Sequence, residues 1–249
     1  MFNNNSTWKK RTLFIVLFII FITVVFSSCT DFFSDSLGKW AARDKSKLVP
    51  KVTVDNVDEL ITLAENDPDL SLEVLRKIQE AAAGSSDEDL AKLQAAALEA
   101  AANASGGASA ILDGLGSLSS IDENSDVEKI VMDAINAMQN LGDTTAILSA
   151  ILPPPPADPL HPENDEAFMA FANQASASDL ALAAVLLVAG EVQRTEADSF
   201  EGIINNVGSS DSVKQAQAMA IVTILAERED AISGPLFDAL DGLGFFKNL

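Results

Sequence analysis

Hydrophobic residues recur every three or four positions along most of the chain, which is the spacing of one face of an α-helix. A helix start is marked at Asp67-Pro68, because aspartate caps helix ends and proline fits the first turn. We expect this helix to end at Gly84. The clearest apolar stripe consists of Val127, Ile130, Val131, Ala134, Ile135, Met138 and Leu141.

Two segments, 180–189 and 218–226, are apolar on almost every side. Such helices are covered on all sides in a folded domain, and both segments are too short to span a membrane. We therefore expect two central helices, beginning near Asp179 and Asp211, and we place Leu186 and Ile221 in the core.

Helix caps recur in a repeated layout, in which a cap opens a long helix and a shorter apolar segment follows. The caps end at Asp87, Asp126, Asp179 and Asp211, in steps of 39, 53 and 32 residues. This layout resembles tetratricopeptide-type repeats of about 34 residues. The residues that characterise this repeat family, a Trp, a Gly-Tyr pair and an Ala-to-Pro pattern, do not occur in order. The resemblance therefore concerns the layout alone. It implies an all-α fold of helical hairpins, either solenoid-like or bundle-like.

A proline-rich insertion, residues 153–162, begins with four consecutive prolines. Such a run excludes an α-helix and favours an extended polyproline spacer. We expect it to connect helices over residues 144–152 and 164–175. A role as a recognition segment is the alternative.

The N-terminal segment has the features of an export signal. Lys9, Lys10 and Arg11 precede an apolar run over residues 13–26 in which one threonine is the only polar residue. Fourteen residues suit the apolar region of a signal peptide and fall short of the ~20 that a spanning helix needs.

Small residues Ser27 and Ser28 stand directly before Cys29, the only cysteine of the chain. This arrangement resembles the lipobox of bacterial lipoproteins. Phe26 occupies the position where leucine is usual, which resembles the relaxed lipobox of spirochaete-type lipoproteins. The resemblance implies cleavage between Ser28 and Cys29 and acylation of Cys29. An uncleaved signal anchor is the alternative, and both place the remaining chain outside the cytoplasm.

Residues 29–50 follow as the lipid anchor and tether, behind a signal peptide over residues 1–28. Aromatic and apolar residues near helical spacing precede a group of cations in this tether, namely Lys39, Arg43, Lys45 and Lys47. The pattern fits a short interfacial helix on anionic lipid, or equally a cap on the helical domain. Residues 51–249 form the predicted all-helical domain.

Composition supports helices and restricts the partners. The chain is rich in alanine, the best helix former, and lacks tyrosine. Its net charge is −21. So acidic a surface repels phosphate backbones, which excludes nucleic acid as a partner.

Catalytic and metal-binding groups are scarce. The only histidine, His161, lies between prolines in a predicted loop, whereas a histidine base must be positioned by the fold. A zinc site needs several His or Cys ligands, and the chain beyond Cys29 has one histidine and no cysteine. Residues 122–126 are acidic, but they fit a helix N-terminus better than a calcium loop. The sequence therefore predicts no enzyme, no metal site and no cofactor.

Two functions remain open, and the domain lies either at the periplasmic face of a membrane or at the cell surface, where a lipoprotein that faces the environment is a third interpretation. The first is a membrane-anchored scaffold that binds an envelope protein through its helical repeats. The second is a periplasmic lipoprotein with a pocket for a small apolar ligand, similar to the helical lipoproteins that accompany tripartite (TRAP) solute transporters. The second function predicts an internal cavity lined by residues such as Phe168, Phe171, Val185 and Met219.

Overall fold

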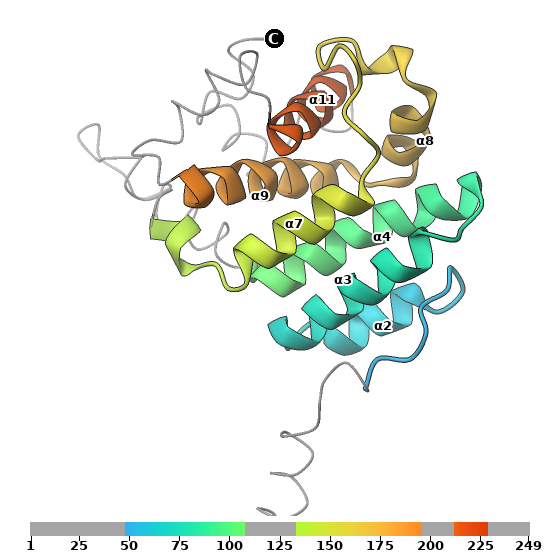
Figure 1. Cartoon of the computed structure of the whole chain (residues 1–249), viewed down its shortest axis with the longest axis vertical. Helices are drawn as coiled ribbons and strands as arrows, with labels where there is room; N and C mark the ends of the chain where they lie inside the picture. The colour runs from blue at the N-terminus through green and yellow to red at the C-terminus, as the bar shows by residue number, and fades with distance from the viewer. Residues whose placement is uncertain (1–47, 108–132, 196–211, 229–249) are drawn as a thin grey trace, which may run out of the picture. The chain divides into compact units, whose positions relative to one another are not determined.

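The computed structural model describes residues 48–107, 133–195 and 212–228 of the chain. Within these ranges the secondary structure is helical and contains no strand, so the predicted all-α fold is confirmed there (Figure 1). The helices are α2 (Val57–Ala64), α3 (Pro68–Ala82), α4 (Asp87–Ser105), α7 (Leu141–Ile151), the 3-10 turn η2 (Pro162–Asn164), α8 (Glu166–Gln174), α9 (Ala177–Thr195) and α11 (Val213–Glu227). They belong to one compact unit that begins at Val49, whose side chain is already buried.

Several helices begin and end where the sequence places their caps. The Asp67 carboxylate accepts a hydrogen bond from the Leu70 amide at 3.1 Å, and Ser86 Oγ caps α4 in the same way. Gly106 ends α4 with φ of 60°, a left-handed conformation that glycine adopts without strain. Helix α3 stops at Ala82, shortly before the expected Gly84.

The region around α8 differs in detail from the prediction. The expected helix over residues 164–175 begins only at Glu166, where Asp165 Oδ1 accepts from the Phe168 amide at 2.9 Å. Pro162, assigned to the extended insertion, instead starts the 3-10 turn η2, which suits proline because its missing amide needs no partner there.

The apolar stripe that ends at Leu141 predicts one continuous helix up to that residue. This prediction is wrong, because the helix is interrupted before Leu141. Residues 133–137 are helical, but the chain then bends, and Leu141 begins the separate helix α7. Asn140 has φ of 51° at the bend, and its side-chain amide donates to Asp69 Oδ1 at 3.3 Å and to the Ala104 carbonyl at 3.5 Å. Contacts with distant helices therefore stabilise a break that the periodicity does not show.

Helix α4 lies at the centre of the packing. It contacts α2, α3, α7, α8 and α9, while α9 also contacts α7 and α11 (Figure 1). In a solenoid each repeat contacts only its neighbours, so these contacts make the fold bundle-like. Leu186 in α9 and Ile221 in α11 are fully buried, which confirms the two predicted central helices.

The proline-rich segment is held against α11. The Gln217 side-chain amide donates to the Pro153 carbonyl at 2.9 Å, and Thr223 Oγ1 donates to the Pro159 carbonyl at 3.2 Å. Pro153 is buried. The segment is therefore a connection between α7 and α8, as expected, and it is fixed along part of its length.

Candidate functional site

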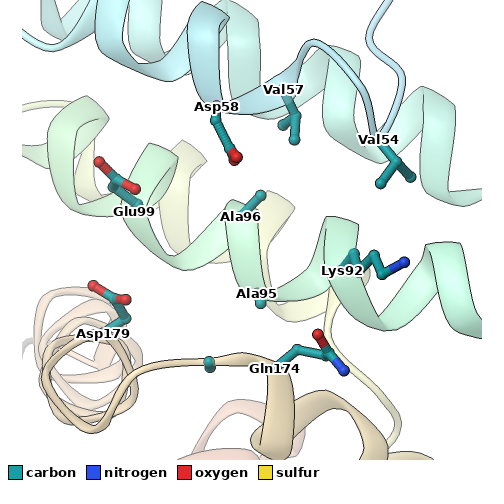
Figure 2. A pocket seen from close by; sticks show the side chains of 10 residues that line it. Val54, Val57, Asp58, Lys92, Ala95, Ala96, Glu99, Gln174 and Asp179 are labelled. Atoms are coloured by element: carbon teal, nitrogen blue, oxygen red, sulfur yellow. The ribbon is translucent and has the colours of Figure 1, made fainter.

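One cleft brings together three carboxylates from distant parts of the sequence. It lies between α2, α4 and the start of α9, and its volume is about 280 Å³. Asp58 of α2, Glu99 of α4 and Asp179 of α9 line it, and Figure 2 shows these side chains on three different helices. The remaining lining residues are Val54, Val57, Lys92, Ala95, Ala96, Gln174 and Ala175. We call this site the acidic cleft.

The charges of the acidic cleft are unbalanced. Partial burial raises the pKa of Glu99, and the negative charges of Asp179, Asp58 and Glu65 raise it further. Lys92 is the only cation among the lining residues, and its ammonium group donates to Glu88 at 2.8 Å. The hydrogen bond to Glu88 raises the pKa of Lys92. Negative charge therefore remains at the cleft.

A second, larger hollow lies between α4 and α8, beside the first prolines of the insertion. Its volume is about 430 Å³. Its lining residues are Asp87, Leu90, Ala91, Gln94, Pro153, Pro154, Glu166, Ala167 and Ala170. We call it the α4–α8 groove. The side chains that line it are mostly small or apolar, and the two charged ones, Asp87 and Glu166, are both acidic.

The four residues expected to line an apolar pocket do not line either of these cavities. Phe168 and Phe171 are fully buried, and their rings pack edge to face with centroids 5.7 Å apart. Val185 belongs to the same hydrophobic core, and Met219 is partly buried. The structure thus places the aromatic pair within the packing between helices.

A buried charge lies where α7, α9 and α11 meet. The Glu191 side chain of α9 is only 3% exposed and accepts two hydrogen bonds from Arg194, at 2.8 and 3.0 Å. Lys214 of α11 lies 3.6 Å from the other carboxylate oxygen and donates to Thr145 Oγ1 at 3.2 Å. Burial acts to raise the pKa of Glu191, but the hydrogen bonds from Arg194 and Ser212 and the nearby cations outweigh it and lower the pKa. This cluster links three helices.

The predicted anchor residues, Ser28 and Cys29, lie outside the described residues, as does the acidic stretch 122–126. His161 is exposed, and its Nδ1 lies 3.2 Å from Glu163 Oε1. Among the described residues, no group of three or more His, Cys, Asp or Glu side chains is arranged to hold a metal ion.

The sequence did not point to the acidic cleft. Asp58, Glu99 and Asp179 are three of 37 acidic residues, and they share no motif or spacing. Their proximity depends on how α2 and α9 pack against α4, which local periodicity does not specify.

Within the described ranges, no single helix combines the length and the apolar composition of a membrane span. Helices α8 and α9 reach that composition only as a pair, and the chain bends by 117° between them. Comparison of the chain with protein-family models, with curated proteins and with solved structures gives no match.

Proposed function

We propose that this chain is a bacterial lipoprotein, anchored through Cys29, whose acidic helical domain binds another protein of the cell envelope. The basic N-terminal residues, the apolar run over residues 13–26 and the small residues before Cys29 support the anchor. Two or more acyl chains would hold the protein stably on the membrane, because one chain binds only marginally. The helical domain would then lie outside the cytoplasm.

The acidic cleft is the observation that supports a binding role. Its lining combines carboxylates from three helices with the apolar residues Val57, Ala95 and Ala96. A partner segment that places a Lys or Arg side chain among these carboxylates, with its aliphatic stem against the apolar residues, would complement both features.

Binding of a cation at this cleft would favour the ionised form of Glu99. Because the pKa of Glu99 is raised in the free protein by burial and by neighbouring carboxylates, binding of a cation would lower it. The affinity for a basic partner should therefore increase as the pH rises through the range in which Glu99 titrates.

Photo-crosslinking in intact cells tests the proposal. A photoreactive residue replaces Ala96 in the full chain, and the matched control replaces Ala83, an exposed alanine at the end of α3 that does not line the cleft. We expect a discrete envelope protein to be captured only from position 96. Glu99→Gln together with Asp179→Asn should reduce this capture at least tenfold.

Equal capture from both positions, or capture that does not respond to removal of the carboxylates, would refute the acidic cleft as the binding site. Recovery of a small apolar molecule with the purified protein, without any protein partner, would instead support the ligand-binding alternative.

A further inference from the structure

The α4–α8 groove has walls that the fold holds in place. The Gln94 side-chain amide of α4 donates to the Ile151 carbonyl at 2.9 Å, which fixes the chain just before Pro153 against α4. The opposite wall is the first half of α8, whose Asp165 cap anchors it. The groove is therefore bounded by two helices and a proline-stiffened connection.

Small side chains leave this groove hollow. Ala167 and Ala170 of α8 are exposed and follow one another at helical spacing, and Ala91 of α4 lies across from them among the lining residues. Leu90 is partly buried there. A larger apolar side chain brought by another molecule would fill the space that these residues leave.

The charges at the groove select among such molecules. Asp87 and Glu166 are exposed, and neither has an ion-pair partner in the part of the chain that the structure describes. Each is the first residue of its helix, where the helix dipole already attracts an acidic group. Both remain accessible to a cation, whereas an acidic ligand would be repelled.

We propose that the α4–α8 groove is a docking site for a protein segment that inserts an apolar side chain between α4 and α8 and places Lys or Arg beside Asp87 and Glu166. The proposal rests on the proposed function in one respect, namely that the partner is a protein. It concerns a surface separate from the acidic cleft, since the two share no lining residue.

The exposure of three lining residues favours a protein segment over a small molecule as the occupant of the groove. Pro154, Ala167 and Ala170 are all exposed, so a small apolar molecule resting on them would keep much of its own surface in water. Sites for small ligands usually enclose at least 70% of the ligand surface. An apolar side chain that belongs to a protein is covered from the outside by its own chain, as at the centre of an interface.

Fluorescence anisotropy with synthetic peptides tests the proposal on the full chain in detergent solution. The probe is a labelled peptide of sequence Lys-Lys-Leu-Leu-Lys-Lys, and two control peptides carry serine in place of leucine or glutamate in place of lysine. We expect the probe to bind at least tenfold more tightly than either control. The Glu166→Gln variant should weaken binding a few-fold and reduce its dependence on salt.

Two cavity-filling variants locate the binding. Ala170→Leu fills the groove at an exposed helical position, where leucine is well tolerated. Ala96→Leu, at a partly buried position of α4, fills the acidic cleft and is the control. We expect Ala170→Leu to weaken the leucine-dependent binding at least tenfold and Ala96→Leu to leave it within twofold, with both variants retaining the helical circular dichroism spectrum.

The other outcomes separate the two proposals. Loss of peptide binding in Ala96→Leu alone would overturn the groove proposal while leaving the proposed function standing. Binding that depends on lysine but not on leucine would also overturn it. Stoichiometric binding of the apolar dye N-phenyl-1-naphthylamine that Ala170→Leu abolishes, without leucine-dependent peptide binding, would assign the groove to a small ligand instead.

Discussion

The close approach of α9 to α7 at Gly190 gives a prediction with an unusual sign. Replacing a helical glycine with alanine normally stabilises a protein by about 1 kcal/mol, because alanine is the better helix former. At Gly190, however, an added Cβ would overlap Thr145 Oγ1 and lie 2.9 Å from the Cβ and Cγ2 of the same threonine. These distances are far below van der Waals contact, so α7 or α9 must shift.

The Thr145 side chain has little freedom to move away. It is β-branched and fully buried, and its hydroxyl donates to the Gly142 carbonyl at 3.3 Å while accepting from Lys214. Forcing additional atoms into such a site costs about 1–3 kcal/mol. After subtraction of the gain in helix propensity, Gly190→Ala should lower the free energy of unfolding by up to about 2 kcal/mol.

Urea denaturation followed by circular dichroism measures this change as a lower midpoint. The control is Gly84→Ala, where an added Cβ meets nothing within 4 Å, and which should leave stability within about 0.5 kcal/mol. In the Thr145→Ala background, where two of the three close atoms are absent, Gly190→Ala should cost less than in the wild type. A Gly190→Ala protein about 1 kcal/mol more stable than the wild type, which is the gain that helix propensity alone would give, would refute the close packing of α7 against α9.

Three further predictions concern the core, the buried charge and the anchor. Leu186→Asp places a charge at a fully buried position and should lower the free energy of unfolding, measured by thermal denaturation, by several kcal/mol. The control Lys77→Ala removes an ion pair near the surface and should lower it by less than about 1 kcal/mol. A well-folded, soluble Leu186→Asp protein would contradict this prediction. Because the pKa of Glu191 is lowered on folding, its ionised form stabilises the fold above its ordinary pKa of 4.5, and this contribution is lost as the pH falls through the lowered value. The stability difference between wild type and Glu191→Gln should therefore be constant from about pH 7 to 5 and shrink below that, and a difference that stays unchanged down to about pH 3 would argue against the ion pair. Cys29→Ala should abolish incorporation of labelled fatty acid and leave a precursor about 28 residues longer, and continued labelling would refute the lipid anchor.

The sequence by itself determined the secondary structure class and much of the core. Apolar residues at every third or fourth position and caps such as Asp67 and Ser86 act within a few residues, so they are visible without knowledge of the fold. The continuous apolar stretches around Leu186 and Ile221 likewise predicted central helices, because only a covered helix tolerates apolar residues on every side.

Only the tertiary structure decided where the chain bends and which side chains meet. Asn140 interrupts an apolar stripe because its amide reaches Asp69 and the Ala104 carbonyl, which belong to helices some 36 to 71 residues away. Asp58 and Glu99 converge for the same kind of reason, since the packing of α2 on α4 brings them to one cleft. Hydrophobic periodicity records which face of a helix is buried. It does not record which helix covers that face or at what angle, and these depend on the fit between side chains on different helices.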